Sequence, residues 1–121
     1  PLIAALFGML AVILGAFGAH GLEKVLDAKM LQRFHTGVEY QFYHSFALGL
    51  AAVLVQRNPN PWYPKAAYAF IAGILVFSGS LYLYVLTGIT KFGMITPIGG
   101  LAFIVGWTCL AWGSWQAETV D

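Results

Sequence analysis

Side chains able to do chemistry gather in one short stretch of the chain, residues 36–44. The stretch combines a carboxylate, an amide, an imidazole and two phenols, and the eleven residues after it, 45–55, are apolar or small without a break. If this segment crosses a membrane, a charge at its centre costs roughly 2.5–3.5 kcal/mol unless it is paired or hydrated. The polar groups must therefore be satisfied inside the protein or serve a function. The candidates are Glu39, Tyr40, Gln41 and His44.

A helix through this stretch is polar on two faces. At 100° per residue, His35, Glu39 and Tyr43 share one side, and Gln41 and His44 lie nearly opposite. We therefore expect the helix to touch protein on both faces. Glu39 in particular is expected to be shielded from bulk water and hydrogen-bonded to a histidine, a tyrosine or a serine.

Two interpretations of these polar groups stay open. In the first, Glu39 bonds a hydroxyl or an imidazole, and His44 bonds Ser78, Ser80 or a tyrosine of the third helix. In the second, Glu39 and His44, together with His20, form a site for a ligand or a proton. We favour the first interpretation, because buried polar groups are usually satisfied by their neighbours.

No catalytic residue, metal or cofactor is predicted. His35 and Glu39 lie one turn apart and could share a metal, but no HExxH pattern is present. Axial histidine ligation of a haem has no support beyond the three histidines. Ser78 and Ser80 lack a nucleophile-elbow motif. The single cysteine, Cys109, excludes an internal disulfide and is read as a small packing residue.

The composition identifies the class of protein. Of the 121 residues, 60% are hydrophobic and only 9% are charged, whereas soluble domains carry about 25% charged residues. The sequence therefore predicts a membrane protein of one domain, residues 1–121. Its expected partners are the lipid bilayer and a homo-oligomer or a larger membrane complex. Without a basic run, nucleic acid is not expected.

Four apolar segments are long enough to cross a bilayer. The charged stretch between the first two, residues 20–33, has a partly amphipathic pattern and predicts a short interfacial helix. The first segment lacks the basic region of a signal peptide and is read as a transmembrane helix. Thr96 and Pro97 are read as the N-cap and first residue of the fourth helix. The result is an all-α bundle of four transmembrane helices at about residues 1–19, 34–55, 65–87 and 97–116.

Small residues recur on one face of the first and fourth helices. Such stripes allow close helix packing in lipid, so we expect these two helices to pack against each other or against a symmetry mate. The packing candidates are Gly8, Gly15 and Gly18 in the first helix, Gly73 in the third, and Gly99, Gly106 and Gly113 in the fourth.

Basic residues give a weak prediction of orientation. The connections after the first and third helices hold four of them, against two in the middle connection. The excess of Lys and Arg in cytoplasmic loops places the first set, and not the two termini, in the cytoplasm. The first set is Lys24, Lys29, Arg33 and Lys91, and the second is Arg57 and Lys65.

Several motifs appear in a characteristic order. They are residues 15–22 (Gly-Ala-Phe-Gly-Ala-His-Gly-Leu), 36–44, 77–82 (Phe-Ser-Gly-Ser-Leu-Tyr), 96–100 (Thr-Pro-Ile-Gly-Gly) and 106–107 (Gly-Trp). Together they resemble domain of unknown function family 423, small multi-pass membrane proteins of bacteria that are related to an animal transmembrane protein. The resemblance covers nearly the whole chain. It implies an integral membrane protein, with no settled activity, substrate or cofactor to carry over.

Two functions from different classes follow. The first is a structural or accessory membrane component in the bacterial inner membrane, oligomeric or bound to a larger complex. The second is a binder or carrier of a small apolar or protonatable ligand that uses Glu39 and His44. An apolar cavity reaching Glu39 or His44 favours the second function. A closed core with an exposed face of small residues favours the first, which we prefer.

Overall fold

The structure, a computed structural model, describes residues 1–119 and is all-helical over that range. The chain forms four long helical segments joined by short connections. Two of these segments contain a π-helical turn between two α-helices. In order, the segments are α1 (Leu2–Ile13), η1 (Leu14–Gly18) and α2 (Ala19–Leu22); α3 (Ala28–Arg57); α4 (Trp62–Gly73), η2 (Ile74–Ser78) and α5 (Gly79–Thr87); and α6 (Lys91–Thr119).

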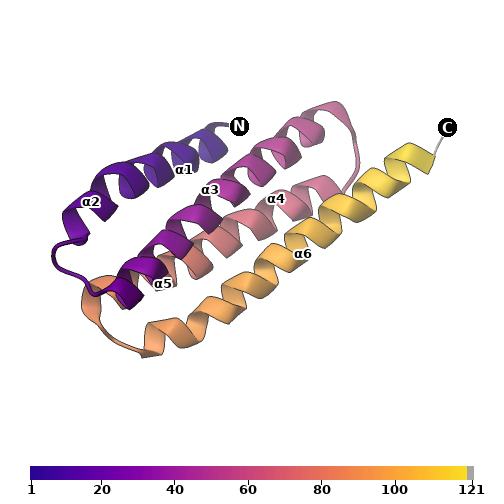
Figure 1. Cartoon of the computed structure of the whole chain (residues 1–121). Coiled ribbons are helices and arrows are strands. Elements are labelled where there is room, and N and C mark those ends of the chain that lie inside the picture. The colour runs from indigo at the N-terminus through magenta and orange to yellow at the C-terminus, as the bar shows by residue number, and fades with distance from the viewer. Residues whose placement is uncertain (120–121) are drawn as a thin grey trace.

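The four segments lie in a row and run alternately up and down (Figure 1). The α1–α2 segment packs on α3, α3 packs on the α4–α5 segment, and this segment in turn packs on α6. Residue Pro1 and the end of α6 lie at the same end of the molecule (Figure 1). The molecule thus has α1 at one edge and α6 at the other.

Three of the segments, Leu2–Leu22, Trp62–Thr87 and Lys91–Thr119, are long and apolar enough to cross a membrane. The fourth, α3, has 30 residues and measures about 45 Å at 1.5 Å per residue. Its length exceeds the ~30 Å of a bilayer core, but it is not among the apolar candidate spans. Its sequence is more polar because it carries exposed residues such as Lys29, His35 and Glu39 in addition to the buried Gln41 and His44.

The predicted interfacial helix over residues 20–33 is not present. The first segment continues to Leu22, a short turn follows, and α3 already begins at Ala28. The Asp27 carboxylate caps α3 by accepting a hydrogen bond from the Met30 amide at 2.8 Å. An N-cap aspartate satisfies a backbone donor that the helix itself leaves unpaired. The charged residues after Asp27 are therefore the first two turns of α3.

The fourth helix also starts earlier than predicted, at Lys91 and not at Pro97. Pro97 lies inside α6, in its second turn, where its missing N–H removes one hydrogen bond near the helix start. Thr96 is not an N-cap, because it lies inside α6. Its hydroxyl instead lies 2.6 Å from that of Ser80 on α5 and faces the Phe92 carbonyl one turn earlier.

The glycines of α6 allow close approach of the α4–α5 segment. A Cβ atom at Gly99 would overlap the backbone nitrogen of Phe77, and one at Gly106 would lie 2.6 Å from the Phe70 ring. Both distances are shorter than real Cβ contacts, so only glycine fits. At the same interface Gly73 faces the Phe103 ring just as closely. Gly113 is less constrained, since a Cβ atom there would lie 3.0 Å from Tyr63 and 3.2 Å from Trp62.

The glycines of the first segment face α3. A Cβ atom at Gly15 would lie 3.0 Å from Val38, and one at Gly18 would lie 3.2 Å from Phe34, whereas Gly8 has room for one. The expectation that the first and fourth helices pack through their small stripes is therefore wrong within the chain. Each stripe is covered by a different neighbour, because α1 and α6 occupy opposite edges of the row.

The two π-helical turns have no counterpart in the predictions from sequence. Both flank the same part of α3: Gly18 of η1 packs on Phe34, and the Ser78 hydroxyl of η2 donates to the Gly37 carbonyl at 2.7 Å. Turns of this kind occur frequently at functional sites. Here both π-helical turns contact α3 between Phe34 and Gly37.

Candidate polar junction inside the helix row

Gln41 joins three helical segments. Its Nε2 donates to the carbonyl of Phe7 in α1 at 2.8 Å, and its Oε1 accepts from the hydroxyl of Tyr82 in α5 at 2.6 Å. The side chain is buried. Because both ends of the amide are used, Gln41 acts as a hydrogen-bonded junction between α1, α3 and α5.

His44 joins α3 to α6. Its Nδ1 lies 2.7 Å from the Tyr40 carbonyl, and its Nε2 accepts from the indole of Trp107 at 3.1 Å. A carbonyl can only accept and an indole N–H can only donate, so these partners assign the neutral imidazole with its proton on Nδ1. The ring also stacks on Phe103, with centroids 3.5 Å apart. Neither nitrogen is left to bind a ligand.

Three buried serines complete the junction. Ser45 donates to the Gln41 carbonyl at 2.6 Å, Ser78 donates to the Gly37 carbonyl, and Ser80 contacts both the Phe77 carbonyl and Thr96. These are bonds to backbone or to another hydroxyl, and none leads to a histidine. The expected hydrogen bond of His44 to Ser78, Ser80 or a tyrosine of the third helix is therefore wrong.

Glu39 is not part of this junction. It is exposed on the outer face of α3, and within residues 1–119 it has no hydrogen bond or ion pair. The expectation that Glu39 is shielded and hydrogen-bonded inside the protein is therefore wrong for the single chain. Its i+5 spacing from His44 turns the two side chains about 140° apart on the helix.

His20 lies away from both of these residues. It is exposed at the end of the first segment, where its Nδ1 lies 3.4 Å from the Glu23 carboxylate. The structure thus brings Gln41, His44 and the serines together, but it separates Glu39 and His20 from them. A combined site of Glu39, His44 and His20 does not form within one chain.

Trp107 and Tyr82 are the partners that the sequence reasoning missed. Trp107 lies well inside α6, apart from Trp112 and Trp115 near the end of that helix. Tryptophan is enriched at membrane interfaces, and a buried indole N–H needs an acceptor. A tryptophan within an apolar span was therefore a signal for a buried acceptor such as His44.

A furrow runs along the surface between α3 and α6. These helices pack on two flanks of the α4–α5 segment, whose side chains form the floor. One half of the furrow, about 530 Å³, is lined by aromatic and apolar residues and touches the edge of His44. The other half, about 410 Å³, lies nearer the 88–90 turn and is lined by Arg33, Tyr84, Thr90 and Thr96 among others. Both halves share Phe77 and Pro97.

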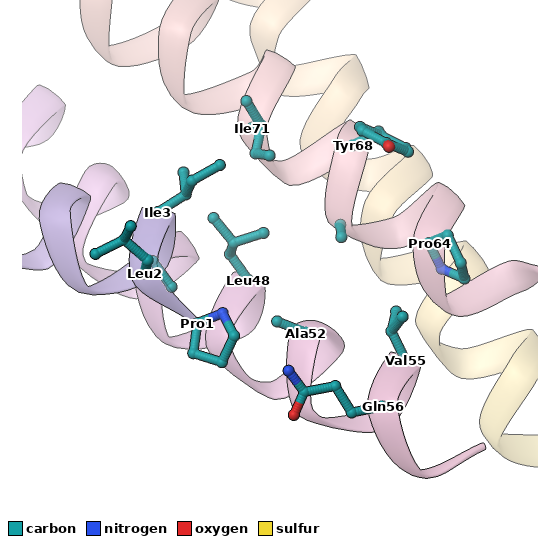
Figure 2. A pocket seen from close by; sticks show the side chains of 12 residues that line it. Pro1, Leu2, Ile3, Leu48, Ala52, Val55, Gln56, Pro64, Tyr68 and Ile71 are labelled. Atoms are coloured by element: carbon teal, nitrogen blue, oxygen red, sulfur yellow. The ribbon is translucent and has the colours of Figure 1, made fainter. Parts of the chain in front are cut away.

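A second groove, of about 510 Å³, lies between the start of α1, the end of α3 and the start of α4. Figure 2 shows side chains of α1, α3 and α4 around it, with Gln56 and Tyr68 as the labelled polar ones. No charged side chain lines the groove, so it offers little chemistry for selecting a ligand. Its labelled residues are Pro1, Leu2, Ile3, Leu48, Ala52, Val55, Gln56, Pro64, Tyr68 and Ile71.

The hydrogen-bonding groups inside the helix row are paired with one another. Over residues 1–119, no three His, Cys, Asp or Glu side chains gather where they could hold a metal ion. Every buried side-chain nitrogen or oxygen in that range has a hydrogen-bond partner. The polar junction therefore fastens helices together, since its donors and acceptors are already occupied.

Residues 14–100 match the family model described as protein of unknown function (DUF423). The chain belongs to this family. The matched region includes η1, all of α3, the α4–α5 segment and the first part of α6. It therefore contains the junction residues described above except Phe7, Phe103 and Trp107.

Relatives from several bacteria match over most of their length. A UPF0382 membrane protein of Haemophilus influenzae is 42% identical over 98% of this chain and 94% of the relative. The Bacillus subtilis protein YwdK is 46% identical over 88% and 87%. The Escherichia coli inner membrane protein YgdD is 37% identical over 93% and 86%. No solved structure was found to match. Family and candidate spans together identify a multi-pass membrane protein of uncharacterised function.

Proposed function

We propose that the chain is a structural or accessory component of the bacterial inner membrane, assembled through the outer face of α3 with a second copy or a larger complex. The observation that carries the proposal is Glu39. Polar residues in membrane helices almost always face protein or a water-filled cavity, yet Glu39 is exposed on a helix of a membrane protein.

The neighbours of Glu39 strengthen this argument. His35 and Tyr43 lie one turn before and one turn after it, and both are exposed. They form a polar strip, which we define as His35, Glu39 and Tyr43. A partner that supplied hydrogen bonds along this strip would remove the cost of leaving it against lipid.

The proposal includes four membrane crossings. The α1–α2 and α4–α5 segments run in the same direction in Figure 1, so α3 must return the chain between them. Residues 36–55 of α3 span about 30 Å, the thickness of a bilayer core. Glu39 then lies about 4.5 Å inside the hydrocarbon boundary.

Site-specific photo-crosslinking in native membranes tests the assembly. A photoreactive residue at Tyr43, inside the strip, is expected to give a discrete crosslinked protein product of one size. The control site is Ile98, which is exposed on α6 and should crosslink to lipid only. A homodimer band identifies a second copy, and a single larger band identifies a complex. If Tyr43 gives only lipid adducts, as Ile98 does, the proposal is wrong.

Binding of a small ligand through Glu39 and His44 is the second candidate function. The furrow supports it in part, because its apolar half touches His44. Glu39 does not line the furrow, however, and both nitrogens of His44 already have partners. A Glu39→Gln variant that keeps its crosslinked product but loses proton or ligand coupling would favour this candidate over the first.

A further inference from the structure

We propose that the furrow between α3 and α6 is a binding site for one anionic phospholipid. The phosphate binds Arg33, and one acyl chain lies along the furrow as far as Trp107. None of the residues that line the furrow belongs to the polar strip, so the site does not depend on the proposed assembly.

The two halves of the furrow form one continuous path. On α6, the lining residues Gly93, Pro97, Gly100, Ile104 and Trp107 follow one another at steps of three and four, which places them on a single helix face. From Gly93 to Trp107 the path measures about 21 Å. One leaflet contributes about half of the ~30 Å hydrocarbon core, so the furrow holds a full acyl chain and leaves room for a headgroup.

Arg33 supplies the charge at one end of this path. Its Nη1 donates to the Tyr84 hydroxyl at 3.1 Å and lies 3.9 Å from the Met30 sulfur. A guanidinium has five N–H donors, and within residues 1–119 those on Nε and Nη2 have no partner. The Arg33 guanidinium also lies over the Tyr84 ring, 4.8 Å from its centroid. The side chain is thus held in place with one edge open.

The charge of the residues that line the furrow indicates an anionic ligand. Among the described residues that line the two halves, Arg33 is the one charged residue and no carboxylate is present. Guanidinium groups bind phosphate through paired N–H donors. Arg33 lies three residues before position 36, and therefore about 4.5 Å outside the hydrocarbon. That is the depth of a lipid phosphate, with the Thr90 hydroxyl at the same end of the furrow.

The apolar half suits an acyl chain. Phe77 and Phe103 form its floor, and Leu101 and Ile104 form a wall that is more than 60% exposed in the protein alone. Trp107 closes the far end, where its ring is 46% exposed while its N–H is bonded to His44. An acyl chain in this position touches the Trp107 ring.

That contact provides the experiment. A chain with Trp62, Trp112 and Trp115 changed to Phe retains Trp107 as its single fluorophore, and it is reconstituted into phosphatidylcholine vesicles. Dibrominated phosphatidylglycerol, which quenches tryptophan on contact, is then titrated against dibrominated phosphatidylcholine. We expect the anionic lipid to reach half-quenching at an approximately tenfold lower mole fraction in the vesicle membrane. One hydrogen bond between a charged donor and a charged acceptor accounts for a difference of this size. Equal quenching by both lipids would overturn the proposal.

Matched variants locate the site. Arg33→Gln should abolish the headgroup preference and Arg33→Lys should retain part of it, whereas Lys29→Gln, at an exposed cation one turn away, should leave it unchanged. Gly100→Leu fills the furrow and should lower quenching by both lipids. If Arg33→Gln keeps the preference, or Lys29→Gln loses it, the assignment to Arg33 is wrong. If millimolar inorganic phosphate removes the preference, the site binds free phosphate, and the lipid proposal fails. If Arg33→Gln does not fold, Arg33→Lys tests the headgroup preference, and an undiminished preference would contradict the assignment to Arg33. Gly100→Leu then tests whether the acyl chain lies in the furrow.

Discussion

The indole of Trp107 donates a hydrogen bond to Nε2 of His44, 3.1 Å away, and so ties the centre of α3 to the centre of α6. These helices otherwise pack on opposite flanks of the α4–α5 segment. The bond therefore joins two helices that lie on either side of the α4–α5 segment. Its loss should lower the stability of the protein.

Trp107→Phe is expected to destabilise the protein by about 1–3 kcal/mol, because it leaves the buried Nε2 of His44 without a donor. The thermal midpoint in detergent measures this loss. Trp112→Phe is the control, since Trp112 is exposed and its indole has no hydrogen bond within residues 1–119. Equal midpoints for the two variants would show that the bond contributes nothing.

Gln41→Glu should be more harmful than Glu39→Gln, although each exchanges one atom. At position 41 the new carboxylate oxygen would face the Phe7 carbonyl, which lies 2.8 Å from Nε2 of Gln41, and two acceptors would then oppose each other. We expect a loss above about 1 kcal/mol. Protonating the new carboxyl restores a donor, so stability of Gln41→Glu should rise as the pH falls. Glu39→Gln should unfold like the parent in detergent, because Glu39 is exposed and has no hydrogen bond within residues 1–119.

Gly99→Ala and Gly100→Ala test the packing of α6 with adjacent residues. A Cβ atom at Gly99 meets the Phe77 backbone, which cannot move away without shifting η2, whereas a Cβ atom at Gly100 comes no closer than 3.9 Å to the Phe77 ring. We expect Gly99→Ala to lower the thermal midpoint strongly. Gly100→Ala should be neutral or stabilising by up to about 1 kcal/mol, because alanine favours a helix. The reverse order would contradict the close-contact interpretation.

Cysteine labelling tests the four crossings and the orientation. Single cysteines replace Val25, Pro59 and Ile89, three exposed turn residues, in a Cys109→Ala background. In intact cells, a membrane-impermeant thiol reagent should modify position 59 and leave positions 25 and 89 unmodified. Labelling of 25 and 59 from the same side would show that α3 does not cross the membrane. Labelling of 25 and 89 alone would keep four crossings and invert the orientation.

The helical class and the number of long segments were predictable from the sequence, because apolar length identifies three segments and the apolar run 45–55 marks the fourth. The start of α3 was not, since Lys29 and Arg33 resemble interfacial residues once the Asp27 cap is overlooked. Thr96–Pro97 has the sequence of a helix start, but its hydroxyl is used by Ser80. In each case a contact with another residue overrode a local pattern.

The candidate site was predicted in part. Gln41, His44, Ser78 and Ser80 were recognised as polar residues that need partners, but Gln41 and Ser78 bond backbone carbonyls. A carbonyl is present at every residue, so sequence cannot indicate which one is chosen. Glu39 was assigned to the interior because a charge in a membrane helix usually faces protein. Which of two polar helix faces is covered depends on where the neighbouring helices lie.

The row arrangement has a consequence for biosynthesis. Each helical segment packs chiefly on the segment made immediately before or after it. During synthesis, each segment therefore meets its main packing partner as soon as the next segment enters the membrane. Domains that rely on such nearby contacts assemble quickly, and the earliest segments can settle while later ones are still being translated. The exceptions are the contacts of His44 in α3 with Phe103 and Trp107 in α6, because the α4–α5 segment lies between these two helices. His44 must enter the bilayer before a donor is present for its Nε2 atom. It gains the Trp107 hydrogen bond only when α6 is synthesised.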